Sequence, residues 1–380
     1  MTATAPKAEA APLNFYRPNN NVLTPEMRSP QWVQMSTAAA ITLGIMPGWM
    51  HRTDCTHCLN LLLTYPEGCR ANCAYCGLAR HRDEERNYAD RNFIRVDWPS
   101  APLDDVIQTI KEGKDGGKVE RMCISMITHP RSEEDTLAIL KKWRAELPEI
   151  PTSILSNPTT MNRADLVALK EAGADIFTVA LDGASEAVFE ATRGKGVQGP
   201  HTWSKYWEVL GMAREIFGRE RIGAHIIIGM GESEQEALET IQKVRDMGGH
   251  SHLFAFFPEE GSLMDDRPAV DRAQYRRVQL GRYLIDFDHA RIEQFSFDAD
   301  GVVTDYGLSA EDYDYFVNQG RAFQTSGCPG KSHDVSACNR PYGDSPVSDI
   351  ASFPFALNAE DVLIAKAQLE GKPVPERAED

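Results

Sequence analysis

The sequence predicts an α/β fold: a partial or complete TIM-like (β/α) barrel with an N-terminal cap and a C-terminal extension that carries cysteines. Two observations lead to this prediction. Apolar runs of strand length alternate with amphipathic stretches of helix length, a pattern typical of parallel strands joined by helices. The 380 residues also suit one barrel-sized domain with extensions. We expect residues 1–58 to form a mobile N-terminus and cap, residues 59–300 the barrel and residues 301–380 the extension.

Seven apolar runs are candidate buried strands. They are Leu59–Tyr65, Arg121–Thr128, Thr152–Ser156, Ile176–Leu181, Ile222–Ile228, His252–Phe257 and Arg291–Phe297. The amphipathic stretches between them predict helices at Leu103–Glu112, Glu133–Ala145, Arg163–Ala172, Trp203–Phe217, Glu232–Met247 and Ala273–Leu284. The stretch from Thr24 to Trp49 is also compatible with helix and forms part of the expected cap. In a (β/α) barrel, functional groups gather at the carboxyl ends of the strands.

Charge and cysteine content exclude several classes of protein. The chain has 40 Lys and Arg against 56 Asp and Glu, a net charge of −16, which argues against a nucleic-acid partner. Eight clustered cysteines are too few for a disulfide-dense secreted domain and favour metal binding in a reducing compartment. The N-terminus lacks the apolar core of a signal peptide, and the most apolar stretch, Ala38–Met50, is too short for a membrane span. We therefore expect a cytoplasmic protein.

The most informative stretch is Leu59–Arg80, which reads LNLLLTYPEGCRANCAYCGLAR. It places Cys69, Cys73 and Cys76 in a C-x-x-x-C-x-x-C loop directly after the first candidate strand. Three thiolates this close together can hold three irons of a cubane cluster and leave the fourth iron open to a small molecule. The four-cysteine runs of electron-transfer ferredoxins leave no such open iron.

A zinc site is the alternative for these cysteines. Cys55-x-x-Cys58 and Cys73-x-x-Cys76 are separated by fourteen residues, which is close to the spacing of a zinc ribbon. A ribbon would leave Cys69 without a role, and its second half would be joined to a strand, loop and helix instead of a hairpin. The sequence therefore favours an iron–sulfur cluster.

With Tyr75 immediately before the last cysteine, the loop resembles that of the radical S-adenosylmethionine (SAM) superfamily, which usually carries an aromatic residue there. The resemblance implies that SAM chelates the open iron of a 4Fe-4S cluster through its amino and carboxylate groups. An electron from a reducing donor would then cleave a carbon–sulfur bond, and the resulting 5'-deoxyadenosyl radical would remove a hydrogen atom from an unactivated carbon. The cofactors supply this chemistry, and the protein supplies placement and exclusion of water.

The same resemblance implies where SAM contacts the protein. Radical SAM barrels hold the methionyl ammonium near the end of the second strand, the ribose with polar groups from the fourth and fifth strands, and the carboxylate with a basic side chain. The candidates here are Ser125, Asn157, Asp182 and Arg193. The usual Gly-Gly-Glu after the second strand is absent, since MITHP stands there. A turn or helix cap is the alternative role for Asn157 and Asp182, and a solvated loop for Arg193.

A second set of cysteines, Cys55, Cys58, Cys328 and Cys338, flanks the predicted barrel. Four thiols are the full ligand set of a second, auxiliary 4Fe-4S cluster, which would join the N-terminal cap to the C-terminal tail. Unrelated buried thiols or a structural zinc site are the alternatives. Cys123 lies inside an apolar strand and is interpreted as a core residue.

The order of motifs resembles the two-component lipoyl synthases. The resemblance rests on the loop Cys69–Cys76, called the cluster loop from here on, on FIRVDWP at Phe93–Pro99, on CISMITHP, and on ACNRPYGDS followed by FPF. It covers most of residues 30–370. It implies a transferase that inserts sulfur into an octanoyl chain on an acyl-carrier protein, together with a paralogous partner enzyme, and it implies that the auxiliary cluster donates the sulfur. The chain lacks the N-terminal three-cysteine set and the Arg-Ser-Ser-Tyr tail of single-protein lipoyl synthases.

Two other functions stay open at this point. The related bacteriochlorophyllide C-7 methyl oxidases use a similar scaffold to hydroxylate a methyl group on a tetrapyrrole. A non-catalytic iron–sulfur scaffold or redox sensor is the alternative from another class, and it would need no SAM pocket.

Overall fold

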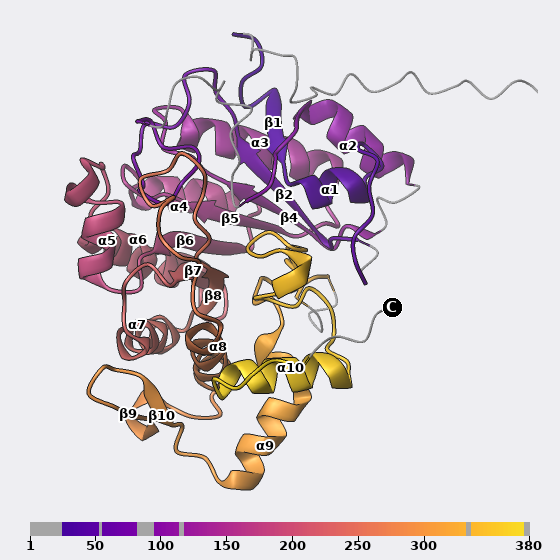
Figure 1. Ribbon diagram of the computed structural model, residues 1–380. Helices are drawn as coiled ribbons and strands as arrows, with labels where there is room; N and C mark the ends of the chain where they lie inside the picture. Colours follow the sequence, from indigo (N-terminus) through magenta and orange to yellow (C-terminus); the bar gives the residue numbers. More distant parts are fainter. Residues whose placement is uncertain (1–24, 53–54, 82–94, 114–117, 332–335, 376–380) are drawn as a thin grey trace, which may run out of the picture.

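The computed structural model describes residues 25–52, 55–81, 95–113, 118–331 and 336–375. Its centre is an eight-stranded sheet of order β3-β1-β2-β4-β5-β6-β7-β8 (Figure 1). The six parallel strands are β2 (Cys58–Leu63), β4 (Arg121–Ser125), β5 (Thr152–Ser156), β6 (Ile176–Asp182), β7 (Ile222–Ile228) and β8 (His250–Ala255). This α/β architecture confirms the predicted fold class. Among the described residues the barrel is partial, because β3 and β8 are the two free edges of the sheet.

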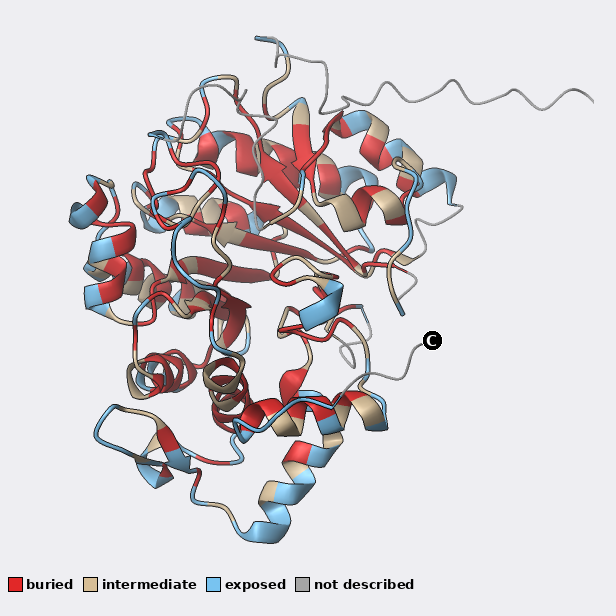
Figure 2. Ribbon diagram, viewed as in Figure 1, coloured by how far each residue is buried: buried red, intermediate tan, exposed pale blue. Residues whose placement is uncertain are grey.

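Helices connect the parallel strands and cover the outer face of the sheet (Figure 1). They are α2 (Leu103–Glu112), α3 (Ser132–Glu146), α4 (Arg163–Glu171), α5 (Glu186–Thr192), α6 (Trp203–Phe217), α7 (Glu234–Asp246) and α8 (Arg272–Asp286). Asn162 and Ser233 begin α4 and α7 with capping boxes, which satisfy the first free N–H groups of each helix. The strands are almost entirely buried between the helices and the interior (Figure 2).

The expected N-terminal helix is largely wrong. Within the stretch from Thr24 to Trp49 only α1 (Thr37–Thr42) is helical, and Trp32–Met35 forms strand β1. β1 pairs antiparallel with β2 on one side and with β3 (Ser100–Pro102) on the other. These residues become a strand because they complete the edge of the sheet, a long-range contact that local periodicity does not contain. The mobile part of the expected N-terminus, residues 1 to about 14, lies outside the described residues, which begin at residue 25.

The last expected barrel strand, Arg291–Phe297, is also wrong. Ile292–Gln294 forms a 3-10 turn, and β9 (Ser296–Phe297) pairs antiparallel with β10 (Val303–Asp305) in a separate hairpin. The side chain of Ser296 is exposed, so this segment does not meet the burial that a parallel barrel strand requires.

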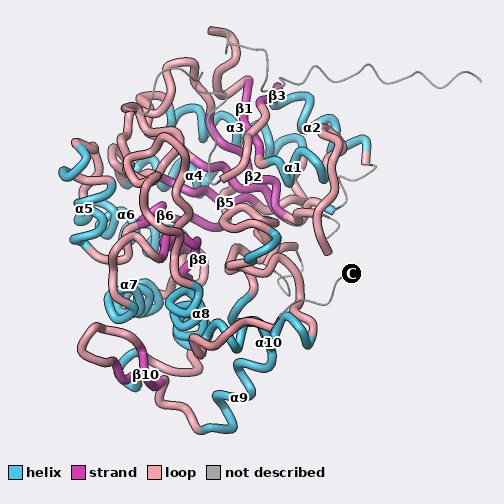
Figure 3. The backbone as a smooth tube through the Cα atoms, viewed as in Figure 1, coloured by secondary structure: helices cyan, strands magenta, loops and turns pink. Residues whose placement is uncertain are grey.

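The C-terminal extension contains α9 (Ala310–Gln319) and α10 (Ala359–Leu369), with long loops before α10 (Figure 3). These loops lie along the free edge of β8, where the Leu253 N–H donates to Ser326 Oγ at 2.8 Å and Arg340 Nη2 donates to Leu253 O at 3.0 Å. Further along, Thr56 Oγ1, just before β2, donates to Asn339 Oδ1 at 3.0 Å. The extension therefore spans the opening of the partial barrel, from β8 to the start of β2. In the described part of the chain no helix is both long and apolar enough to cross a membrane.

Candidate active site

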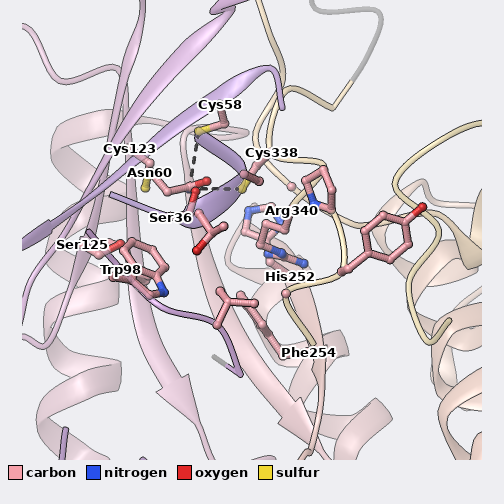
Figure 4. Close-up of a pocket in the computed structure, with 18 of the residues that line it drawn as sticks. Ser36, Cys58, Asn60, Trp98, Cys123, Ser125, His252, Phe254, Cys338 and Arg340 are labelled. Carbon is pink, nitrogen blue, oxygen red and sulfur yellow. Dashed lines mark hydrogen bonds between the residues drawn. The ribbon is translucent and has the colours of Figure 1, made fainter. Parts of the chain in front are cut away.

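The inner face of the partial barrel is small and polar, where a (β/α) barrel is usually filled by bulky branched side chains. Alternate residues of a strand face the same side of a sheet. Cys123 and Ser125 on β4, Thr178 on β6, His225 on β7 and His252 on β8 accordingly line one cavity of about 220 Å³ (Figure 4). The residues on this face are too small to fill the interior, and they leave room for a ligand.

A second cavity, of about 120 Å³, adjoins the first toward the carboxyl ends of the strands. Its walls include Tyr75 and Cys76 from the cluster loop and Asp182 from the end of β6. The two cavities share the lining residues Arg95, Leu155, His225, Phe254 and Gly343. The two cavities are therefore neighbours. A ligand that extended from one cavity into the other along these shared residues would reach from the cluster loop into the interior of the barrel.

The cluster loop follows β2, the first parallel strand, as the sequence predicts. Backbone hydrogen bonds fix it to two later elements: the Arg70 N–H donates to Thr128 O at 2.8 Å, and the Ala74 N–H donates to Thr192 O at 2.7 Å. These contacts hold the loop against the end of β4 and the end of α5. The loop is thus positioned by the barrel and does not depend on its own sequence alone.

The loop also presents backbone donors to its own sulfurs. The N–H of Ala71 points at Cys69 Sγ, and the N–H of Leu78 points at Cys76 Sγ, each at 3.4 Å. Hydrogen bonds of this kind stabilise thiolates and tune the potential of iron–sulfur clusters. The three cysteines therefore fit a 4Fe-4S cluster in chemistry and in local hydrogen bonding.

Burial raises the pKa of all three thiols in the metal-free protein. The pKa of Cys73 rises to about 11, mainly because of burial, against an opposing effect of the nearby Arg193. The pKa values of Cys69 and Cys76 are raised for the same first reason. Because iron binds the thiolate, cluster assembly at this loop must release protons.

Four of the sequence-predicted residues come together in one hydrogen-bonded network. Tyr75 Oη donates to Asp182 Oδ2 at 2.5 Å, and Arg193 pairs with the same carboxylate. Arg193 Nη2 also donates to Asn157 Oδ1 at 2.7 Å and to Tyr206 Oη at 2.8 Å. The Arg193 side chain is only 1% exposed, so it does not belong to a solvated loop. The network ties the cluster loop to the ends of β5 and β6.

The charge of Arg193 is held in place by these neighbours. Burial alone would lower the pKa of its guanidinium, but Tyr206, Tyr75 and Asp182 raise that pKa well above the ordinary value. Its terminal nitrogens already donate to Asp182, Asn157 and Tyr206, so the charge of Arg193 holds this network together beside the cluster loop.

The position of Asp182 depends on an irregularity of the sheet. The pairing of β6 with β7 shifts between Ala180 and Asp182, and Asp182 has a φ of 59°. Asp tolerates this left-handed conformation better than most residues, and a bulge redirects the side chains that follow it. The end of β6 thereby turns its carboxylate toward Tyr75 and Arg193.

Ser125 lies elsewhere. It ends β4 and lines the larger cavity, as does Cys123 two residues earlier in the same strand. The structure therefore places this candidate SAM contact beside the second set of cysteines and not in the Arg193 network.

Three of the four cysteines predicted to hold a second cluster, Cys58, Cys328 and Cys338, line the larger cavity. Cys55 is buried with its Sγ 3.7 Å from His57 Nδ1. In the described residues no three His, Cys, Asp or Glu side chains converge closely enough to hold a single metal ion. Thiolates that bind different irons of one cubane need not converge in that way.

Cys123 is buried in a small core cluster with Cys58, Ala337 and Cys338, as predicted, but it also lines the same cavity, which sequence reasoning did not foresee. The signal was present in β4, where Arg121, Cys123 and Ser125 alternate with the apolar Met122 and Ile124. A strand covered by helices on one face and by core on the other would be apolar throughout. Alternation in a parallel strand indicates a polar interior.

Comparison with known protein families supplies the deciding observation: residues 63–244 match the model of the radical SAM superfamily. Residues 63–244 form a radical SAM domain. The family of this domain implies a 4Fe-4S cluster and SAM as co-substrate, and the matched range contains the cluster loop and all five members of the Arg193 network, Tyr206 included. The protein is therefore a radical SAM enzyme.

Solved structures show distant likeness in fold. Methylornithine synthase (PylB) is 15% identical, with 66% of this chain and 67% of that chain covered and a TM-score of 0.46. HydG, a maturase of the FeFe-hydrogenase, is 14% identical over 60% of this chain and 50% of its own, with a TM-score of 0.48. SuiB of Streptococcus suis, bound to S-adenosylmethionine, is 17% identical over 63% of this chain and 49% of its own, with a TM-score of 0.43. Among curated proteins, none matches this chain.

Proposed function

We propose that this radical SAM enzyme is a sulfurtransferase of the lipoyl synthase type, which inserts sulfur into a protein-bound octanoyl chain. The observation that carries the proposal is the pair of adjoining cavities, one beside Tyr75 and Cys76 and the other beside the second set of cysteines. An acyl chain bound across the residues that the two cavities share would have one end near Tyr75 and Cys76. Its other end would lie near the second set of cysteines. When bound, SAM and its cluster supply hydrogen abstraction, and a second 4Fe-4S cluster supplies sulfide.

The residues of the chain have separate roles in this proposal. Cys69, Cys73 and Cys76 hold the SAM-binding cluster, and the second set, in which the sequence predicted Cys55, Cys58, Cys328 and Cys338, holds the auxiliary cluster. Tyr75, Asn157, Asp182 and Arg193 position SAM, with Arg193 as the cation for its carboxylate. Ser125, at the end of β4, lines the larger cavity, in which the acyl chain would lie.

The walls of the larger cavity suit a hydrocarbon. Ile41 and Met50 come from the N-terminal segment, Trp98 from the segment before β3, and Leu155 and Phe254 from the barrel. Apolar walls bind an alkyl chain by the hydrophobic effect and keep water away from a reactive carbon radical. Trp49, which also lines the cavity, is 81% exposed and stands at its entrance.

Cavity size favours an acyl chain over the tetrapyrrole alternative. Pockets for drug-sized ligands usually have volumes of about 300–1,000 Å³. The two cavities measure about 220 and 120 Å³, and the larger one must also accommodate the second cluster. A slender chain fits this space better than a rigid macrocycle. The buried cation beside the cluster loop in turn favours an enzyme over a scaffold or sensor, which needs no SAM pocket.

A reducing, cytoplasmic location belongs to the same proposal. All eight cysteines are free thiols, and thiolates that assemble iron–sulfur clusters must stay reduced. An acyl-carrier protein as substrate, a paralogous partner enzyme and an electron donor are also proposed.

The test is an anaerobic reaction of the reconstituted protein with dithionite, SAM and an octanoylated carrier peptide, with and without the paralogous protein. We expect 5'-deoxyadenosine, and a gain of one or two sulfur atoms in the mass of the peptide. The matched control is Cys73→Ala, which should form neither product. An unchanged peptide beside a hydroxylated tetrapyrrole would favour the oxidase. A protein that keeps its cluster but forms no 5'-deoxyadenosine would favour the sensor.

A further inference from the structure

We propose that Cys123, and not Cys55, completes the ligand set of the second cluster together with Cys58, Cys328 and Cys338. The inference rests on the proposed second cluster and assigns its fourth ligand. It replaces the set read from the sequence, in which the C-x-x-C spacing favoured Cys55.

Strand register places Cys58 and Cys123 on the same wall. β2 and β4 pair in parallel, with Cys58 opposite Arg121 and Asn60 opposite Cys123. Side chains two apart in a strand share a face, so Cys58 and Cys123 project into the interior from neighbouring strands, one pleat apart. Figure 4 shows their sulfurs on either side of Asn60, at the edge of the cavity.

The tail brings the other two thiols to this wall. Cys58, Cys123 and Cys338 pack in one buried cluster, and Asn60 Nδ2 lies 3.6 Å from the Sγ of Cys58 and of Cys338 (Figure 4). Cys328 is also buried, with its Sγ 3.7 Å from His252 Nε2. All four thiols border the same cavity.

Two arginines, Arg121 and Arg340, line the cavity beside these four thiols. Arg121, which is fully buried, is held by Asp175 at 2.6 and 2.9 Å and donates to Pro329 O, next to Cys328, at 2.6 Å. Arg340 is partly buried and stacks over the Phe254 ring at 3.8 Å. Four thiolates around an iron–sulfur core carry net negative charge, which needs compensation when it is buried.

Cys55 occupies a different environment. Its Sγ lies 3.7 Å from His57 Nδ1, and its carbonyl accepts a hydrogen bond from Asn339 Nδ2 at 3.2 Å. Asn339 directly follows Cys338 and is also bonded to Thr56. These contacts give the Cys55 segment a structural task, which is to hold the tail so that Cys338 faces the barrel.

The experiment isolates the second cluster. In a protein with Cys69, Cys73 and Cys76 all changed to alanine, only the second site can hold iron, and anaerobic reconstitution should give about four irons and four sulfides per chain. Adding Cys123→Ala leaves three thiolates, which can still hold a cubane with one open iron, so it should lower the iron content or change the electron paramagnetic resonance signal of the reduced cluster. Adding Cys55→Ala should leave both unchanged. Thr178→Val, which changes a buried non-cysteine side chain in the same cavity, is the matched control.

The outcomes separate the two proposals. No iron in the triple-alanine protein would contradict the second cluster itself. Loss of iron with Cys55→Ala would overturn only the assignment of Cys123, as would a Cys123→Ala protein with both its iron content and its resonance signal unchanged. Circular dichroism checks that each variant is folded. If Cys123→Ala does not fold, Cys123→Ser should keep the fold and shift the resonance signal, because serine would bind iron through oxygen. An unchanged signal in Cys123→Ser would then overturn the assignment.

Discussion

Replacing Arg193 with methionine should lower the free energy of unfolding by about 3–5 kcal/mol, which is the usual cost of removing one partner of a buried ion pair. The guanidinium is almost fully buried and bonds to Asp182, Asn157 and Tyr206. Methionine has a similar length and can pack against Phe189 and Tyr206, whose rings contact the guanidinium at present. The loss therefore comes from the unpaired carboxylate of Asp182 and not from a cavity.

A double-mutant cycle tests this origin. Asp182→Asn keeps a residue that tolerates positive φ and removes the charge. If the ion pair is the cause, the combined Asp182→Asn and Arg193→Met variant should lose less stability than the sum of the single variants, by about 0.5–3 kcal/mol. The assay is urea unfolding of the metal-free proteins, followed by circular dichroism.

The control for the cycle is an exposed ion pair. Arg163 and Glu215 meet at 2.6 Å with more than half of each side chain exposed. Arg163→Gln should therefore change stability by less than about 1 kcal/mol. If Arg193→Met loses no more stability than the control, the buried ion pair is not what fixes the ends of β5 and β6. The same conclusion would follow if the stability losses of the two single variants simply add in the double variant.

Two further predictions concern stability. Gly183→Ala should lower the free energy of unfolding by about 1–3 kcal/mol, because the new Cβ would meet the Phe189 backbone at 2.7 Å. Gly211→Ala, inside α6 with its nearest contact at 3.9 Å, should raise the free energy of unfolding by about 0.5–1 kcal/mol. Thermal unfolding compares the two variants, and equal shifts in their melting temperatures would contradict the packing argument. His201 is buried beside Arg193, and burial first and then this charge lower its pKa well below 6.5. Between the two pKa values only the unfolded chain binds a proton at this histidine. As the pH decreases below 6.5, the free energy of unfolding should therefore decrease by about 1.4 kcal/mol per pH unit because of this site. Urea unfolding at pH 7 and 5.5 measures how the free energy of unfolding depends on pH. His201→Asn should reduce this dependence by the contribution of His201, and an unchanged dependence would exclude His201 as its source.

Elements with a strong local pattern could be predicted from the sequence. Leu103–Glu112 and Trp203–Phe217 are helices with the expected bounds, and Thr152–Ser156 and Ile222–Ile228 are strands with the expected bounds. In these segments the apolar residues repeat with one period, and tertiary contacts reinforce that period. β1 could not be found in the same way, because Trp32–Met35 is a strand only where β2 and β3 flank it.

The candidate site shows the same division. Tyr75, Asn157 and Asp182 could be expected near one another because they stand in the cluster loop or at the ends of parallel strands, which meet at one edge of the sheet. Arg193 follows α5, and the structure brings it to the same network. Contact of these residues with SAM stays a prediction. Tyr206 was missed because it is a helix residue, and only the fold of α6 against α5 brings its hydroxyl to Arg193. Ser125 also ends a strand, and it lines the larger cavity together with Cys123.

The direction of the strands explains how the proposed second set of cysteines can line a cavity that adjoins the one beside the cluster loop. Cys58 begins β2, and the cluster loop follows the end of the same strand, so the two sets lie at opposite ends of one buried element. A closed barrel packed with branched side chains would separate them. Here small and polar residues such as Ser125 and Thr178 keep the interior open, and the missing strands beyond β8 leave a gap through which the tail delivers Cys328 and Cys338. Partial closure of the barrel is therefore a requirement of the proposed chemistry: the second set of ligands can assemble only because the sheet stops at β8.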